Sequence, residues 1–293
     1  MTTDRLNAFS FDGAPVRGQI VRLTRAWQRI RGDHRYAPAA ERMLGEMTAI
    51  VAMLAQGIKL DGSVILQIRG VGHVRTAMAE CIDRTILRGI LRTEGDADDG
   101  DALQNSGRLA ITLKPRRGEM YQGIVPLETG SVAGAVESYF QSSEQLPTRI
   151  WAAADQNCAA GLLLQRLPEP QRARPDALER DAESWNRLQI LADTMSAQEL
   201  LTVPSERLLL RLFHADALRL QPALDLAFGC SCSAQRTANA LRIMGRAEVD
   251  QILAQEGAIQ VTCEFCGEVY GFDPIDARLL FEPLAGELPA TRQ

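Results

Sequence analysis

Four cysteines near the end of the chain stand in two closely spaced pairs. One residue separates Cys230 from Cys232, two separate Cys263 from Cys266, and thirty residues lie between the pairs. Thiolates are soft ligands, and two such pairs from two segments supply the four corners of a zinc tetrahedron. None of the three histidines lies between the first and the last of these cysteines. We therefore predict an all-cysteine site that binds one zinc ion per chain.

This site can be purely structural, or it can be a switch. Most all-cysteine zinc sites stabilise a small fold. Residues 230–293 hold few large apolar side chains, so metal binding, which contributes about 10–16 kcal/mol at such sites, must supply much of their stability. Oxidation of each pair to a local disulfide would consume all four ligands. Such disulfides close only tiny loops and cannot replace the cross-link between the two segments. The pattern therefore also suits a redox switch that is folded and zinc-bound when reduced.

Two further cysteines and an acidic run are weaker candidates. We expect Cys81 and Cys158 to be buried, inert thiols, because the sequence shows no activating base for either. The acidic run 94–101 resembles a calcium loop but lacks the glutamate that such a loop carries at its twelfth position. We interpret this run as a solvated loop.

Composition and charge exclude several classes of protein. The net charge of −5 and the pI of about 5.4 attract neither nucleic acid nor anionic lipid. The chain does not begin with a basic segment followed by an apolar run, and no apolar stretch reaches the length of about 18 residues that spans a membrane. We therefore expect a cytoplasmic protein, with no membrane or nucleic-acid partner, in a compartment that keeps thiols reduced.

The hydrophobic pattern of the first part predicts an α+β fold. Alternating apolar residues predict strands, and apolar residues every three or four positions predict helices. The predicted strands cover 62–70, 109–113, 120–125, 148–154 and 161–167, and the predicted helices cover 43–58 and 132–140. The stretch Pro168–Pro175 holds three prolines in eight residues and predicts the end of this domain.

The second part predicts a helical linker. Leu178 to Ala192 has one apolar face, Ser196 and Glu199 form a capping box for a short helix, and Ser205 is expected to cap another. Apolar side chains on these helices need a surface to cover, and we expect them to pack on the first domain: Trp185, Leu188, Leu208 and Phe213.

The last part predicts a small domain around the four cysteines. Two helices should end at Gly245 and Gly257, strands should flank the second cysteine pair, and Asp273 should cap a final helix. The chain thus divides into a mixed sheet-and-helix domain over 1–170, a helical linker over 171–229 and a four-cysteine zinc domain over 230–293.

Several stretches resemble one known family, the heat shock protein 33 chaperones or 33 kDa chaperonins, which are redox-regulated holdases. The spacing of the four cysteines is the most specific of these features, and the resemblance extends along nearly the full chain. The other stretches that carry it are Tyr121–Val125, Tyr139–Thr148, Ala160–Gln165, Glu199–Leu201 and Arg211–His214.

This resemblance implies a function and a mechanism. Zinc is held by Cys230, Cys232, Cys263 and Cys266 in the reduced, inactive state. Oxidation pairs Cys230 with Cys232 and Cys263 with Cys266. The linker then unfolds, apolar surface binds unfolded or partly unfolded client proteins, and the active form is a homodimer. The family uses no ATP, which agrees with the absence of a phosphate-binding Gly-x-x-x-x-Gly-Lys-Ser/Thr loop from the sequence.

Two other functions compete with a chaperone. A zinc-ribbon nucleic-acid binder is disfavoured, because residues 230–293 carry five arginines, no lysine and nine acidic residues. A thiol–disulfide oxidoreductase would use Cys263 and Cys266, but it would place them at the start of a helix, whereas a glycine and a strand pattern follow them here. We therefore expect a chaperone and no enzymatic activity.

Overall fold

The fold is that of a computed structural model, and it divides into two compact units. The structure describes residues 4–32, 34, 36–58, 60–71, 73–94, 107–127, 131–168 and 175–282. Unit 1 comprises Met1–Gly229 and unit 2 comprises Cys230–Gln293. The acidic run, apart from Glu94, and most of the proline-rich stretch 168–175 lie outside the described residues.

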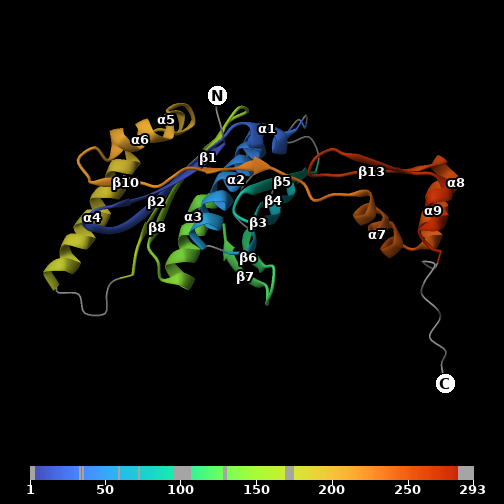
Figure 1. Cartoon of the computed structure of the whole chain (residues 1–293), viewed down its shortest axis with the longest axis horizontal. Coiled ribbons are helices and arrows are strands. Elements are labelled where there is room, and N and C mark those ends of the chain that lie inside the picture. Colours follow the sequence, from blue (N-terminus) through green and yellow to red (C-terminus); the bar gives the residue numbers. More distant parts are fainter. Residues whose placement is uncertain are drawn as a thin grey trace, which may run out of the picture. The chain divides into compact units, whose positions relative to one another are not determined.

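Unit 1 is a mixed α+β structure, as the sequence predicts (Figure 1). Its strands are β1 (Arg5–Phe11), β2 (Ala14–Leu23), β3 (Gly62–Val71), β4 (Val74–Ile82), β5 (Ile86–Thr93), β6 (Arg108–Pro115), β7 (Tyr121–Pro126), β8 (Thr148–Ala154), β9 (Ala159–Arg166), β10 (Leu218–Leu220), β11 (Leu224–Asp225) and β12 (Ala227–Phe228). Its helices are α1 (Arg25–Arg31), α2 (Pro38–Ile58), α3 (Val132–Tyr139), the π-helical turn η1 (Phe140–Glu144), α4 (Pro175–Asp193), α5 (Ala197–Thr202) and α6 (Ser205–Leu212).

The strands of unit 1 form two six-stranded sheets. Sheet A has the order β10-β1-β2-β9-β8, with β11 also paired to β1, and sheet B has the order β12-β5-β4-β3-β6-β7. Neighbouring strands run antiparallel except for β12, which pairs in parallel with β5. The segment just before Cys230 contributes edge strands to both sheets. Its strands β10 and β11 lie at the edge of sheet A, and its strand β12 lies at the edge of sheet B.

Helix α2 lies between the two sheets and forms the centre of the main core. It packs against β2, β8 and β9 of sheet A and against β3, β4 and β5 of sheet B. Such a helix must be apolar nearly all round, and most of its residues from Ala40 to Ala55 are buried. Close packing also requires Gly45, since a Cβ there would lie 2.3 Å from the Cβ of Ala154.

Helices α4, α5 and α6 cover the other face of sheet A (Figure 1). Between these helices and the sheet lies an apolar cluster separate from the main core. It contains Phe9 and Phe11 of β1 and the four residues that the sequence predicts to pack on the first domain: Trp185, Leu188, Leu208 and Phe213. The ring of Phe213 meets that of Phe11 edge-on, with centroids 5.2 Å apart. Sheet A therefore has an apolar face that only these helices cover among the described residues.

Of the two helix caps predicted for α5 and α6, one is present and the other is not. Ser196 and Glu199 form the predicted capping box, with both reciprocal hydrogen bonds present. The expectation that Ser205 caps α6 is wrong. Ser205 is the first helical residue, Pro204 takes the cap position, and no side chain caps that end. Proline fixes φ near the value that an entry into a helix requires, so the start of α6 is set without a hydroxyl.

Unit 2 is a small structure with its own apolar cluster. It contains α7 (Ala234–Met244), α8 (Arg246–Glu256), β13 (Ile259–Thr262), β14 (Val269–Phe272) and α9 (Pro274–Leu279). Gly245 and Gly257 end the first two helices as predicted. Asp273 caps α9 through the amides of Ile275 and Asp276. Across the described ranges of both units, no helix is long and apolar enough to cross a membrane.

Candidate metal centre

The first cysteine pair lies in a loop between β12 and α7. Ser233 caps α7 by accepting a hydrogen bond from the amide of Arg236 at 3.2 Å. The guanidinium of Arg236 reaches back to Ser231, where it donates to the backbone carbonyl at 2.9 Å and to the hydroxyl at 2.6 Å. The residue between Cys230 and Cys232 is thus hydrogen-bonded to the first turn of α7, which restrains the loop that carries both cysteines.

The second pair lies in the turn of the β13–β14 hairpin. The strands pair from Ile259 with Phe272 to Thr262 with Val269, so the hairpin ends directly beside Cys263. The amide of Cys263 donates to the carbonyl of Glu268, and the amide of Gly267 donates to the carbonyl of Cys263, both at 2.8 Å. Gly267 has a φ of 74°, a conformation that favours glycine. The second pair thus lies in a tight turn between two strands, and the sequence predicts strands on both sides of it.

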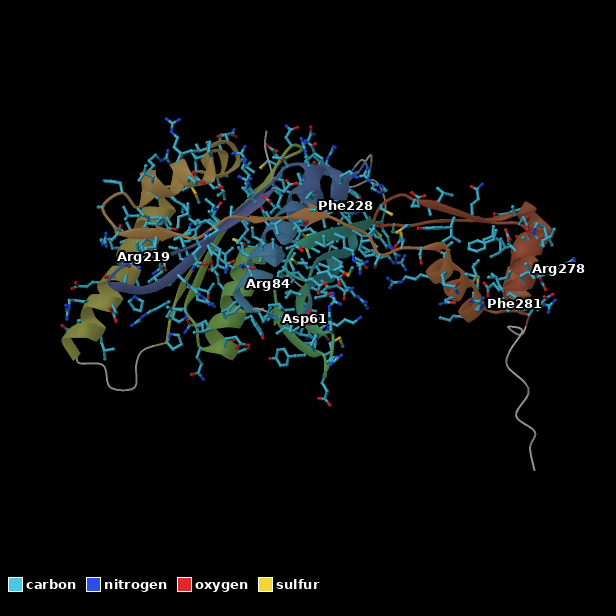
Figure 2. All side chains as sticks on the ribbon, in the orientation of Figure 1. Asp61, Arg84, Arg219, Phe228, Arg278 and Phe281 are labelled. Carbon is cyan, nitrogen blue, oxygen red and sulfur yellow. The ribbon has the colours of Figure 1, made fainter. Side chains whose placement is uncertain are left out.

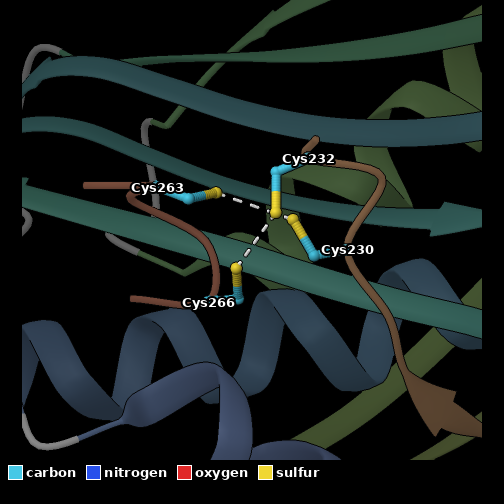
Figure 3. Close-up of side chains that lie close together, drawn as sticks. All are labelled: Cys230, Cys232, Cys263 and Cys266. Atoms are coloured by element: carbon cyan, nitrogen blue, oxygen red, sulfur yellow. Dashed lines mark hydrogen bonds between the residues drawn. The ribbon is translucent and has the colours of Figure 1, made fainter. Parts of the chain in front are cut away.

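The hairpin and the loop bring the four thiols together, as Figure 3 shows. All four sulfur atoms lie within 4.8 Å of one another. The sulfurs of Cys230 and Cys263 are 3.6 Å apart and those of Cys232 and Cys266 are 3.3 Å apart. A zinc ion with four thiolates at about 2.3 Å has sulfurs about 3.8 Å apart, so the spacing and the soft donor set both fit a tetrahedral thiolate site. The cluster can bind a metal ion.

A tyrosine completes the surroundings of the sulfurs. The hydroxyl of Tyr270, on β14, donates to the sulfur of Cys232 at 3.1 Å. This hydrogen bond lowers the pKa of Cys232 to about 7, because it stabilises the thiolate. Burial instead raises the pKa of Cys230 and raises that of Cys266 to about 12. The sequence predicts the strand that carries Tyr270 but gives no sign that its hydroxyl faces the cysteines.

The two other cysteines lie apart from this cluster in unit 1. Cys81 on β4 and Cys158 before β9 are both buried. Burial raises the pKa of Cys81 to about 12 and that of Cys158 to about 11, so both stay protonated at neutral pH. The structure thus agrees with the expectation that these thiols are inert.

The local fold bears on the rival functions. Cys263 and Cys266 lie in a β-hairpin turn and not at the start of a helix, which is where a thioredoxin-like oxidoreductase carries its cysteine pair. The exposed acidic excess of unit 2 likewise opposes phosphate contacts.

Comparison with known proteins gives a consistent result. The family model described as Hsp33 protein matches residues 4–273. A 33 kDa chaperonin of Ectopseudomonas mendocina is 42% identical over 287 residues, which are 96% of each chain. A 33 kDa chaperonin of Chromobacterium violaceum is 40% identical over 284 residues, which are 95% of this chain and 94% of the relative.

A solved structure shares the fold. The crystal structure of the 33 kDa chaperonin from Thermotoga maritima matches with a TM-score of 0.79 at 20% identity and covers 94% of this chain and 97% of that protein. At this identity the likeness shows the fold alone. The family match and the relatives near 40% identity show more: the chain belongs to the Hsp33 family, whose members are chaperones and not enzymes.

Proposed function

We propose that the chain is a redox-regulated, ATP-independent holdase. In this proposal the reduced protein binds zinc and is inactive, and the oxidised protein binds unfolding proteins and prevents their aggregation. The observation that carries it is the convergence of four thiols, from two segments, in a unit with a small apolar core. Residues 1–170 bind clients and dimerise, residues 171–229 form the redox-sensitive linker, and residues 230–293 form the switch.

The metal of the proposed switch is zinc, one ion per chain. Cys230, Cys232, Cys263 and Cys266 would hold it as thiolates, and it would supply a cross-link between the first loop and the hairpin. An all-sulfur donor set with this spacing favours zinc over hard cations such as calcium or magnesium, which prefer oxygen.

The proposed switch is the oxidation of these four thiols. Cys230 pairs with Cys232 and Cys263 with Cys266. As each S–S bond forms, two thiolates give two electrons to an oxidant such as hydrogen peroxide, whose O–O bond breaks; with two protons from solvent it becomes two molecules of water, and zinc would lose its ligands. Neither disulfide joins the loop to the hairpin. Unit 2 then keeps only the contacts of its own small cluster, in which the largest buried side chains are those of Phe272, Leu241, Ile259 and Leu280. A core of this size is too small to hold the unit together alone.

The surface that the proposed switch exposes lies under α4, α5 and α6. Helices α5 and α6 have six and eight residues, and isolated helices below about 12–15 residues rarely persist in water. If the linker leaves sheet A, an apolar face becomes free on the sheet and on the helices. Apolar surface of this kind binds unfolded chains without sequence preference. The buried strand residues of sheet A on this face are Phe9, Phe11, Val16, Ile20, Ala153, Ala160, Leu162 and Leu164.

Light scattering of a heat-unfolding protein tests the proposal directly. Reduced protein should leave aggregation unchanged, and protein oxidised with hydrogen peroxide should suppress it at about one chain or one dimer per client. The Cys230→Ser/Cys232→Ser variant should lose zinc and the sharp dependence on oxidant. The matched control, Cys81→Ala/Cys158→Ala, removes the buried thiols and should still switch. Normal zinc content and normal switching in the Cys230→Ser/Cys232→Ser variant would refute the proposal.

A further inference from the structure

The segment just before Cys230 crosses the edges of both sheets of unit 1. This segment, Ala217–Gly229, is called the strap below. Its strands β10 and β11 pair antiparallel with β1 of sheet A, and its strand β12 pairs in parallel with β5 of sheet B. Arg219 and Phe228 mark its two ends in Figure 2. The strap thus lies along β1 at the edge of sheet A and along Ile86 and Leu87, the start of β5, at the edge of sheet B. By connectivity it is the last part of unit 1 before the four-cysteine unit.

The strap is attached mainly through its backbone. Leu226, which is 5% exposed, is its one buried residue, whereas α4, α5 and α6 each bury several. Beyond the strand pairs, its backbone donates to the carbonyls of Ala8, Asp4, Thr85 and Leu87 at 2.8–3.0 Å. Its ion pairs, such as Arg5 with Asp225 at 2.9 Å, are exposed and contribute little. Backbone pairing of this kind accepts almost any extended chain.

The side chains of the strap that do face inward follow a strand pattern. Leu224, Leu226 and Phe228 are alternate residues, and all three pack on the main core. The guanidinium of Arg29 lies over the ring of Phe228, 5.5 Å from its centroid. A cleft of about 440 Å³ lies beside them, lined by Asp4 and by residues of α1 and of the strap. An extended segment with apolar residues at every second position would fit the same place.

We propose that an unfolding client docks on the edges of β1 and β5 by adding an extended segment of its own backbone where the strap had been. This inference rests on the proposed function, because it requires that oxidation loosens the linker up to Gly229. A freed strand edge presents unpaired N–H and C=O groups, which pair readily with another extended chain. The favoured client segment is a strand-forming one with alternating apolar residues, a pattern that unfolding proteins expose in quantity.

The occupant is a client and not a second copy of the chain. A second copy would offer an identical strap, which leaves the cleft beside Arg29 unfilled, as it does within the chain. A client adds apolar side chains of its own in the cleft beside Arg29. Pairing by a second copy is the alternative that the experiment must be able to detect.

Hydrogen–deuterium exchange on the wild-type full-length chain tests the proposal. The probe is reduced, carboxymethylated α-lactalbumin, which stays unfolded. Peptides that cover 5–11 and 86–93 should be protected in reduced protein, should exchange about tenfold faster after oxidation, and should regain protection with the probe. The peptide that covers β7, the opposite edge strand of sheet B, should stay unchanged in all three states and serves as the internal control.

Each other outcome overturns the proposal in a distinct way. If both edges stay open with the probe while the oxidised protein suppresses aggregation, clients bind elsewhere and only this inference fails. If both edges stay protected after oxidation without a client, the strap has not left or a second copy has replaced it. If oxidised protein does not suppress aggregation, the proposed function itself fails.

Gly229 allows a second test that needs no oxidant. A Cβ at Gly229 would lie 2.5 Å from Cγ2 of Ile86, so with alanine there the strap or Ile86 must shift for the strap to pair with β5. Gly229→Ala should therefore loosen the strap in reduced, zinc-containing protein, speed exchange in 86–93 by about tenfold and allow capture of the probe. Gly271→Ala is the control, because a Cβ at Gly271 meets no atom within 4 Å. Equal exchange and equal capture in the two variants would contradict the proposal.

Discussion

The two units of this chain are stabilised in different ways. In unit 1, α2 and two sheets enclose a large apolar core. All of the largest fully buried side chains in the described residues belong to unit 1, such as Trp27 in this core and Phe9 in the cluster under α4, α5 and α6. Unit 2 has a small cluster, while Ile243 and Ile275 are mostly exposed. Apolar burial is the main favourable term in folding. Unit 2 therefore needs another source of stability, and its four convergent thiols provide the ligands for one.

A second difference lies within unit 1. Helix α2 is buried from both sides, whereas α4, α5 and α6 lie on one face of sheet A and bury one side. The proposed switch releases α4, α5 and α6. Their removal would leave the main core around α2 covered. Regions of lower local stability are the ones that can open without global unfolding.

Removal of the metal should have the largest effect and should separate the two units. Zinc binding contributes about 10–16 kcal/mol at sites of this kind, far more than the small cluster of unit 2 can replace. A strong chelator added to reduced protein should therefore abolish amide protection in residues 230–282 and leave α2 and its neighbours protected. Hydrogen exchange read by mass spectrometry would show this, and metal analysis should give one zinc per chain beforehand. Persistent amide protection of β13 and β14 without metal would show that unit 2 does not depend on the metal for its stability.

Much of the difference between the two units can be predicted from the sequence. The predicted strand over 148–154 coincides with β8, because alternation and clear end signals act together there. The convergence of the cysteines follows from their spacing, because few arrangements other than a shared metal explain two short-range pairs.

Other elements leave no such signal. Strands β4 and β5 are not predicted, because the charged residues Glu80 and Arg88 interrupt the apolar pattern of their sequences. In the structure these two side chains form an ion pair at 2.6 Å between the neighbouring strands. The strap is missed because its strands have only two or three residues each, which is too short for alternation to predict a strand. Tyr270 is missed for a related reason: the sequence does not tell which face of a two-stranded hairpin a site will use.

The docking of the linker should show the next largest effect, and α6 offers a matched pair of leucines. Leu209 is 1% exposed and packs on sheet A, while its neighbour Leu210 is 69% exposed. Leu209→Ala should destabilise the docked linker by about 2–5 kcal/mol, the usual cost of such a truncation in a core. Reduced Leu209→Ala should then suppress aggregation without oxidant, while Leu210→Ala should behave like the parent chain. Light scattering checks both, and equal behaviour of the two variants would show that α6 does not control activity.

A carboxyl in α2 should make the stability of unit 1 depend on pH. Burial raises the pKa of Glu46 from 4.5 to about 7, partly offset by Arg42. A raised carboxyl pKa means that this group favours folding below pH 4.5 and that the benefit is lost as the pH rises through about 7. Glu46→Gln should therefore stabilise unit 1 by about 1–3 kcal/mol at pH 8 and have little effect near pH 4.

The same helix provides a control of opposite sign. Glu41 is buried and pairs with Arg31 at 2.9 Å, so Glu41→Gln removes one partner of an ion pair and should destabilise at pH 8. Urea unfolding of both variants at pH 4 and pH 8 measures these differences. A destabilised Glu46→Gln variant at pH 8 would show that its carboxylate has a favourable partner.

The smallest predicted effect concerns the hydroxyl of Tyr270 and tests how finely unit 2 depends on its thiolates. The hydroxyl donates to Cys232 at 3.1 Å and is the main cause of the lowered pKa of that thiol. Since zinc binds the thiolate, Tyr270→Phe must weaken zinc binding at neutral pH. The loss of one hydrogen bond corresponds to about 1 kcal/mol, or roughly fivefold in affinity. Competition with a chromogenic chelator measures the affinity.

The pH dependence distinguishes this effect from a change in packing. Cys232 has a lowered pKa, so its thiolate is available above pH 7 and is lost as the pH falls through that value. The difference in zinc affinity between Tyr270→Phe and the parent chain should shrink above pH 9, where the thiol ionises without help. Val269→Ala, at the exposed neighbour on the same strand, should leave the affinity unchanged. A loss of affinity in Tyr270→Phe that stayed constant from pH 6.5 to 9.5 would assign the tyrosine to packing of the hairpin and not to the ionisation of Cys232.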